Sequence, residues 1–552
     1  MTGWVGTVRG RANKATNAVA RRAERMRLLN AVLWAVIAGL GVAFVAQWYL
    51  KRIIHTNSAA AAAPIDITRV ALTIVGGVGG VVALVIAYRR QRDLEQGRFV
   101  ERFGAAAAQL GASDVAVRIA GVYAMAGAAD ESDGLQRQQC IDVLCGYLRL
   151  PYTPELGGNH QTKLVLKHHR AVADGTRADD EERHLEYRHN DKEVRQTIVR
   201  VIADRTRPTA EYSWSSSEFR TAYLEDVDFS DGVFGGAARF GNATFAGDAM
   251  FVDATFVQIA QFEGVTFGGA AMFDGATFGG STAFDGVAFM DEARFTNASF
   301  TDRVGFATAT FSSTAQFADA VFSGPAHFAQ VEFSGRAQFV NAKFRQPLVF
   351  SGTTFSDTTW FSDTTFSSDA LFDRTTFAAD AAFAGASFLG DTSFHAAQFA
   401  GNARFGSTGY AGAATFALVT FSGAAIFNGA RFARRTVFQE ATFLGNTRFQ
   451  DVDFRGDAVF RRTVFCGIAV FVGAYFAGDT DFEGATFADA VDFRGIDFGG
   501  DRVTFAGPAQ WGPPAPRFDW DPDPTAMPVN VEPQDWPPPV SSTGPNELDP
   551  SS

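Results

Sequence analysis

Aromatic residues recur through the second half of this 552-residue chain at alternating steps of five and six positions. Two rings therefore appear in every eleven residues, without a slip, from Phe229 to Phe498. Tyr410 is the one ring of the series that is not Phe. So short and faithful a repeat is typical of a solenoid, because one unit cannot bury its apolar face alone and has to stack on its neighbours.

The spacers between the rings indicate strands and turns. An eleven-residue period also occurs in right-handed coiled coils, but these need strong helix formers between the apolar positions. Here the spacers are rich in Gly, Asp, Asn, Ser and Thr, which favour turns, as in the segment from Phe273 to Phe278. A small residue stands two positions before most rings, as Ala243 does before Phe245, so both face the same side of an extended segment.

These units resemble the pentapeptide-repeat family. The resemblance implies a mainly β fold, a right-handed quadrilateral β-helix, over residues 219–505. In this chain every second step has an extra residue, so we expect a coil of 22 residues with a wider turn or small bulge on two of the four faces. The span would hold roughly 12 coils in a rod on the order of 60 Å long.

A row of aromatic rings can also serve as a platform on which nucleic-acid bases or other ligands stack. Such platforms are exposed and interleaved with Lys and Arg. These rings instead share their inward phase with Ala, which predicts that they form the core.

Two uncharged apolar segments, residues 28–50 and 70–88, lie near the N-terminus. Each is long enough to cross ~30 Å of hydrocarbon as a helix. A cleaved signal peptide is an alternative for the first, since Ala59–Ala63 resembles a cleavage region, but a second apolar segment follows directly. We therefore predict a two-helix transmembrane hairpin in contact with the lipid bilayer.

Basic residues crowd the leader, residues 1–27, and the stretch 89–102, whereas the connecting loop, residues 51–69, holds few. Positively charged flanks stay in the cytoplasm. We expect a multi-pass protein of the inner (plasma) membrane with both termini cytoplasmic. Gly76 and Gly80 would let helices approach closely, either within the hairpin or in a homodimer.

Residues 89–210 show helical periodicity, with apolar stripes over 115–126, 141–148 and 194–202. Its segments 101–111 and 117–125 resemble a helical module often found between membrane anchors and pentapeptide repeats in bacterial proteins. We expect an α-helical connector domain that joins the hairpin to the rod and covers its first open coil. The charged stretch 174–191 predicts a solvated loop.

The tail, residues 506–552, is rich in Pro and acidic residues, with Trp511, Trp520 and Trp536 scattered through it. This composition predicts disorder, because the segment cannot bury enough apolar surface to order itself. We expect its first residues to fold back over the last coil as a plug, and the remainder to stay disordered or bind a partner.

Three cysteines, Cys140, Cys145 and Cys466, are too few for a disulfide framework and fit a reducing compartment. The first two, with His160, His168 and His169, would suggest zinc. Their spacing matches no zinc-ligand pattern, however, and Cys145 fits the apolar stripe of a helix. We predict no metal site.

The sequence contains no nucleophile elbow, phosphate loop, dinucleotide motif or paired histidine ligands in a credible context. We therefore predict that the protein is not an enzyme, binds no cofactor, and has no catalytic, cofactor-binding or metal-binding residue.

The layout predicts a non-catalytic, membrane-anchored scaffold that presents a rigid cytoplasmic β-solenoid to an unidentified cytoplasmic or membrane protein. The alternative comes from pentapeptide-repeat relatives that mimic DNA and inhibit a topoisomerase such as gyrase. Acidic residues only modestly outnumber basic ones in the repeats, and one stretch is basic: Arg434, Arg435, Arg461 and Arg462. We expect no direct nucleic-acid binding, because the charge of the solenoid has the wrong sign.

Overall fold

The computed structural model describes residues 64–152, 163–169, 180–186, 191–212, 214, 217–499 and 501–541, with single positions between 37 and 52. The basic leader and most of the first apolar segment lie outside the described residues. The chain divides into two compact units, Met1–Arg102 and Phe103–Ser552.

The first long helix, α2 (Pro64–Leu110), runs without a break through the second apolar segment and into the connector. The sequence predicted a boundary after residue 88, but the residues that follow are rich in helix formers such as Arg, Gln and Glu. No helix in the described part of the chain is long and apolar enough to cross a membrane, so the predicted transmembrane hairpin is not found there.

Three helices form the connector: α3 (Val115–Asp130), α4 (Gly134–Leu148) and α5 (Asp191–Thr206). They coincide with the three predicted apolar stripes, and each packs against the other two.

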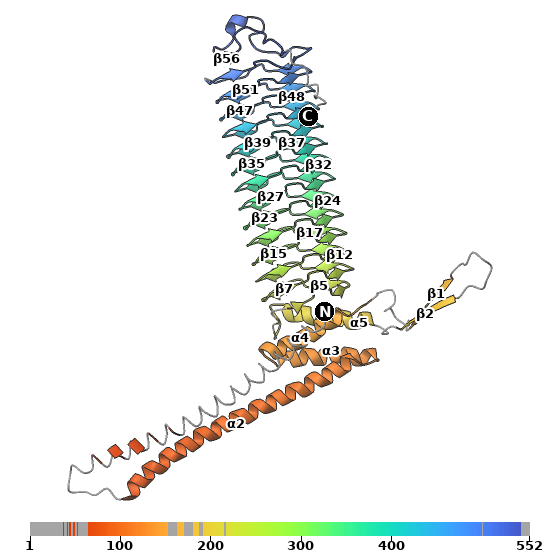
Figure 1. Cartoon of the computed structure of the whole chain (residues 1–552), viewed down its shortest axis with the longest axis vertical. Coiled ribbons are helices and arrows are strands. Elements are labelled where there is room, and N and C mark those ends of the chain that lie inside the picture. The colour runs from red at the N-terminus through yellow and green to blue at the C-terminus, as the bar shows by residue number, and fades with distance from the viewer. Residues whose placement is uncertain are drawn as a thin grey trace, which may run out of the picture. The chain divides into compact units, whose positions relative to one another are not determined.

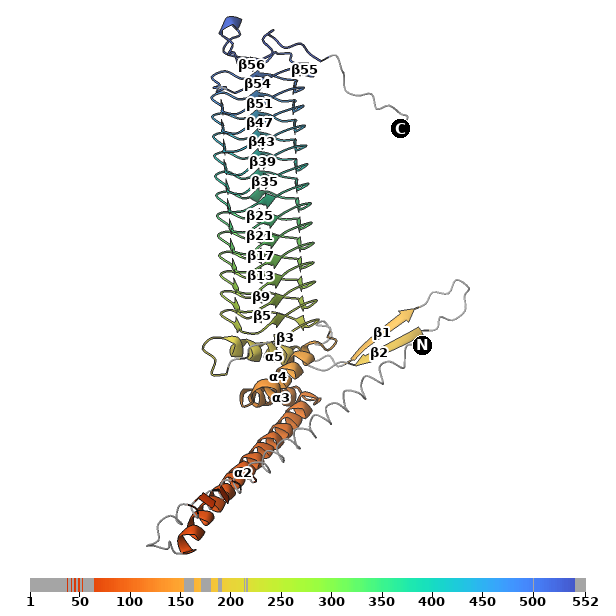
Figure 2. The ribbon, with the colours of Figure 1, turned by 60° about the vertical axis from the view of Figure 1, so that its left-hand side comes forward.

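The connector is not purely helical, because an antiparallel hairpin lies between α4 and α5 (Figure 2). Its strands are β1 (Lys163–His169) and β2 (Asp180–Glu186), so the predicted solvated loop over 174–191 is wrong in part. The register places Lys163 opposite Glu186 and Lys167 opposite Glu182. Opposite charges across a strand pair are favourable, and a search for helical periodicity does not detect them.

The repeats form a four-sided parallel β-solenoid (Figure 1). Each coil contributes one two-residue strand to each side, for example β10 (Thr255–Phe256), β11 (Ala260–Gln261), β12 (Thr266–Phe267) and β13 (Ala271–Met272). The four stacks have 12, 15, 14 and 13 strands, close to the expected number of coils.

We number the four sheets I to IV in the order in which the strands of one coil, β10 to β13, enter them. Sheet I runs from β6 (Val233–Phe234) to β50 (Tyr475–Phe476), and sheet II from β3 (Ser217–Glu218) to β56 (Val531–Glu532). Sheet III runs from β4 (Tyr223–Leu224) to β55 (Gln510–Trp511), and sheet IV from β5 (Val227–Asp228) to β53 (Val491–Asp492).

The register follows the sequence repeat, since Thr255 pairs with Thr277 and Phe256 with Phe278. A coil therefore contains 22 residues, as predicted. The Phe256 and Phe278 rings stack with centroids 4.8 Å apart and planes 1° apart. Neighbouring columns meet edge to face, as Phe251 and Phe262 do at 5.9 Å and 87°.

The aromatic series forms a continuous dry core, because every ring from Phe229 to Phe498 is at most 4% exposed. Most of the small residues two positions before the rings are buried as well. Each ring removes on the order of 150 to 250 Å² from water. The platform alternative is therefore wrong for these rings.

The extra residue of the longer step lies in the corners that leave sheets I and III. The segment Val257–Ile259 is one such three-residue corner, whereas Glu263 and Gly264 form a two-residue turn after sheet II. The second residue of each two-residue turn is left-handed, with φ of 67° at Gly264 and 55° at Asp253. This conformation favours Gly, Asn and Asp, which accounts for their periodic use.

Asp and Asn side chains satisfy backbone groups that the three-residue corners leave unpaired by the sheets. The backbone N–H of Asp391 donates to Oδ1 of Asp369 at 3.0 Å, and the N–H of Ala413 donates to Oδ1 of Asp391 at 2.9 Å. Each carboxylate thus bonds to the same corner of the next coil. These repeated hydrogen bonds offset the free-energy cost of desolvating a backbone N–H at a position where no sheet hydrogen bond is available.

The beginning of the tail folds back over the last coil, as predicted for its first residues, and the order extends further, so the predicted disorder over 506–552 is wrong for residues 506–541. Strand β55 extends sheet III and β56 extends sheet II (Figure 2). Four aromatic side chains cover the last rings of the core: Trp511, Phe518, Trp520 and Trp536. Composition alone was misleading because the end of the solenoid supplies the apolar surface that the tail lacks. Residues 542–552 lie outside the described part.

Candidate functional site

The outward side chains of the solenoid form its most extensive candidate interaction surface. In sheets I and III the first residue of each strand faces outward, and in sheets II and IV the second does. Inward positions hold aromatic rings and residues that are mostly no larger than Val, with Leu348 as an exception, whereas the outward positions vary.

Sheets III and IV differ in how much their outward rows vary. Thr is the commonest residue in the outward row of sheet III, and it recurs at Thr244, Thr266, Thr310, Thr354, Thr376, Thr420, Thr442 and Thr486. The row of sheet IV mixes charged, amide and apolar side chains: Asp228, Met250, Met272, Arg294, Gln316, Gln338, Trp360, Ala382, Arg404, Ile426, Arg448, Val470 and Asp492. Sheet IV therefore offers more distinctive chemistry to a binding partner.

The structure does not gather the predicted basic stretch into one patch. Arg434 and Arg435 lie in the corner that enters sheet II, and Arg461 and Arg462 lie in the turn that leaves it one coil later. Arg461 is neutralised by Glu483 at 2.5 Å and by Asp481 at 3.3 Å. The basic character is thus divided between two edges of one face.

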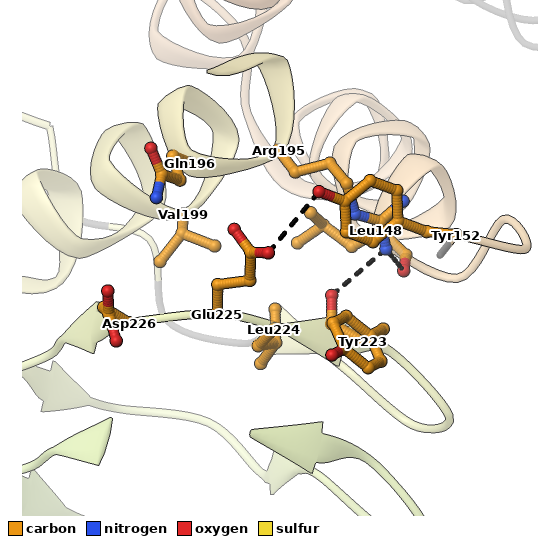
Figure 3. A pocket seen from close by; sticks show the side chains of 9 residues that line it. All are labelled: Leu148, Tyr152, Arg195, Gln196, Val199, Tyr223, Leu224, Glu225 and Asp226. Atoms are coloured by element: carbon orange, nitrogen blue, oxygen red, sulfur yellow. Dashed lines mark hydrogen bonds between the residues drawn. The ribbon is translucent and has the colours of Figure 1, made fainter. Parts of the chain in front are cut away.

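A small pocket lies where the connector meets the first coil (Figure 3). The Arg195 guanidinium stacks over the Tyr152 ring, 4.5 Å from its centroid, and donates to the Tyr223 carbonyl at 3.1 Å. The Tyr152 hydroxyl lies 3.5 Å from Oε1 of Glu225. The pocket has room for about one water molecule, which is too little for a larger ligand. Its residues instead join the connector helices to the first coil of the solenoid.

Burial sets the electrostatics of this joint. It lowers the pKa of Arg195, an effect that the Asp191 carboxylate opposes. Burial, followed by the charge of Glu225, raises the pKa of Tyr152. Lys192 pairs with Glu225 at 3.1 Å, so α5 holds the first coil through Lys192 and Arg195, both near its N-terminal end.

A buried ion pair holds the connector helices together. Arg118 of α3, which is fully buried, contacts Oδ1 of Asp191 at 2.6 Å and the Tyr147 hydroxyl at 3.0 Å. The Tyr147 hydroxyl also donates to Asp191 at 2.5 Å. Sequence reasoning missed this cluster, although one signal was present: Arg118 lies within the apolar stripe of α3.

The residues considered for zinc do not form one cluster. Cys140 and Cys145 are buried in α4, and burial raises their pKa to about 11 and about 12. His168 and His169 lie in β1 opposite Glu181 and Asp180, and His160 lies outside the described residues. No group of three or more possible metal ligands occurs in the part of the chain that the structure describes.

The fold defines a parallel β-solenoid with a dry aromatic core. A protein-family model described as "Pentapeptide repeats (9 copies)" matches residues 233–277, 262–310, 328–376 and 416–464. The solenoid is therefore built of pentapeptide repeats, as the sequence predicted. Neither the curated proteins nor the solved structures gave a match.

Proposed function

We propose that this protein is a non-catalytic, membrane-anchored scaffold whose cytoplasmic solenoid binds another protein. The main support for this proposal is the contrast between the repeated aromatic rings of the core and the varied side chains on the outer faces of the solenoid. Stacked rings fill the axis of the described solenoid, while the 13 outward positions of sheet IV hold eight different residue types. Rigid repeats of this kind provide extended binding surfaces.

Membrane anchoring is supported by the chemistry of the second apolar segment, residues 70–88. The segment has no charged residue. Val81, Leu84, Ile86 and Tyr88 of α2 are 60%, 74%, 60% and 65% exposed, an apolar surface that a bilayer would cover. The first segment, residues 28–50, lies mostly outside the described residues, and on its composition it is proposed as the first helix of the hairpin.

The native cysteines provide a test of topology. Cys466 is exposed, whereas Cys140 and Cys145 are buried with raised pKa values and should react slowly. In intact cells a membrane-impermeant maleimide should leave the natural chain unlabelled and should label a Ser58→Cys variant. After permeabilisation, Cys466 should react. Labelling of Cys466 in intact cells would contradict a cytoplasmic solenoid.

The scaffold function predicts that partner binding depends on the solenoid. Deleting residues 244–485 removes eleven whole 22-residue coils, since Thr244 pairs with Thr266 at one end and Val464 with Thr486 at the other. The deletion keeps both ends of the solenoid and the register. Proteins captured from membranes by the full chain should be lost with this variant. An identical set of captured proteins would contradict the proposal.

The DNA-mimic alternative has less support, because arginines are interspersed with the acidic residues along the rod. Arg294 pairs with Asp274 at 3.0 Å and Arg404 with Asp380 at 3.1 Å, both on sheet IV. Such pairs interrupt the continuous negative surface that a basic DNA channel would bind.

A further inference from the structure

An apolar patch lies on the C-terminal half of the solenoid, where the three-residue corners that follow sheet III lead into sheet IV. Its members are Ile426, Leu444, Cys466, Ile468 and Val470. Leu444 is 50% exposed and Ile468 is 43% exposed. The pairing of β44 (Thr442–Phe443) with β48 (Val464–Phe465) places the corner of Leu444 directly below that of Cys466 and Ile468.

The residues around the two exposed side chains are small, so few neighbouring atoms cover Leu444 and Ile468. Gly423, Gly445 and Gly467 stack at its centre, and a Cβ on Gly445 would lie 2.4 Å from the carbonyl oxygen of Gly423. No side chain can stand at these positions without displacing the backbone. Leu444 and Ile468 therefore project from a flat surface and are accessible to a partner.

Arg448, beside the patch, has no counter-charge among the residues that the structure describes. Arg448 is exposed in the outward row of sheet IV, between Ile426 and Val470. In the same row, Arg294 pairs with the carboxylate 20 positions earlier and Arg404 with the one 24 positions earlier. The equivalent positions for Arg448 are Asn428 and Ala424, and no ion pair forms with Arg448 among the described residues.

We propose that this apolar patch and Arg448 together bind a segment of a partner protein that presents apolar side chains around a carboxylate. Apolar contact with Leu444 and Ile468 would bury the exposed surface, and the carboxylate would neutralise Arg448. Arg suits such a site because its planar guanidinium group binds a carboxylate through two hydrogen bonds. The strands of the patch are already paired on both sides, so the partner binds through side chains and not by adding a strand.

This inference rests on the proposed scaffold function and is tested by photocrosslinking in cells that produce the full chain. Benzoylphenylalanine is placed at Ser422, an exposed corner residue beside the patch. The matched control is Ala411, which occupies the equivalent exposed position in the opposite corner of the same coil. We expect an adduct at Ser422 whose crosslinked peptide carries Asp or Glu beside apolar residues, and a much weaker adduct at Ala411.

Arg448→Glu should reduce the Ser422 adduct at least about tenfold, because like charges would then face each other, whereas Arg448→Lys should retain most of it. Exchanging the partner's carboxylate for Arg should restore the adduct to the Arg448→Glu chain. The side chain is exposed, so both variants should keep the circular dichroism spectrum of the parent.

An adduct unchanged by Arg448→Glu would overturn the proposal. A crosslink to residues 542–552 of the same chain would also overturn it, since the occupant would then be internal. Adducts at Ala411 but not at Ser422 would contradict binding at this patch and would still agree with the scaffold function. The in-register coil deletion tests the scaffold function separately.

Discussion

A chain that ends at Phe505 is expected to self-associate, because it lacks residues 506–541, the cap that covers the C-terminal end of the solenoid. Strands β55 and β56 pair with sheets III and II, and an isolated bridge between Asp492 and Arg517 extends sheet IV. Without them three sheets end in unpaired edges beside exposed aromatic rings. Open edges and large apolar patches both promote association.

The measurement is analytical ultracentrifugation of the detergent-purified chain. We expect more than about half of the truncated chain to sediment as species larger than the parent at micromolar concentration. The matched control ends at Ser541 and lacks only residues 542–552, so it keeps every described contact of the cap. It should sediment like the full chain. Identical sedimentation of the Phe505 truncation would show that the cap does not protect this end.

The second large effect is expected from Phe361→Ala in the middle of the core. The Phe361 ring stacks between Phe339 at 4.8 Å and Phe383 at 4.9 Å, and it meets Phe350 and Phe372 edge to face at 5.6 Å. Removing a buried ring of this kind costs about 3 to 5 kcal/mol. Collapse around the cavity is restricted, since the stacked sheets fix the spacing of the coils.

The loss should be local, because each coil contacts only its neighbours. Hydrogen exchange is the suitable measurement. Protection of the strands β29 (Thr359–Trp360) and β33 (Ala381–Ala382) should fall at least about 100-fold, while coils far from the substitution change little. Thr365→Ala, in the outward row of the same coil, should alter stability by less than about 0.5 kcal/mol. Equal effects of the two substitutions would contradict a core dominated by the ring columns.

The solenoid and its core could be predicted because their determinants lie close together along the chain. Whether a residue such as Phe256 faces inward depends on its step from the preceding ring and on the small residue two positions before it. The same count predicted the 22-residue coil and the two wider corners. A period repeated this often averages out local exceptions such as Tyr410.

The parts that sequence reasoning missed depend on partners far away in the chain. Arg118 and Asp191 are 73 positions apart, and nothing near either residue marks the other. The hairpin of β1 and β2 escaped notice because its cross-strand charge pairs have no helical period. The apolar patch around Arg448 was not visible either, since its members alternate with buried residues over several coils.

By itself, the sequence determined the solenoid, the inward phase of its rings and the length of its coil, because these follow from a short period that forces each unit to bury its apolar side on the next. Only the tertiary structure decided how far the tail is ordered, which charged residues pair in the connector, and which side chains lie together on the outer faces. Each of these depends on which surface happens to lie within reach, and that is settled when coils and helices pack together.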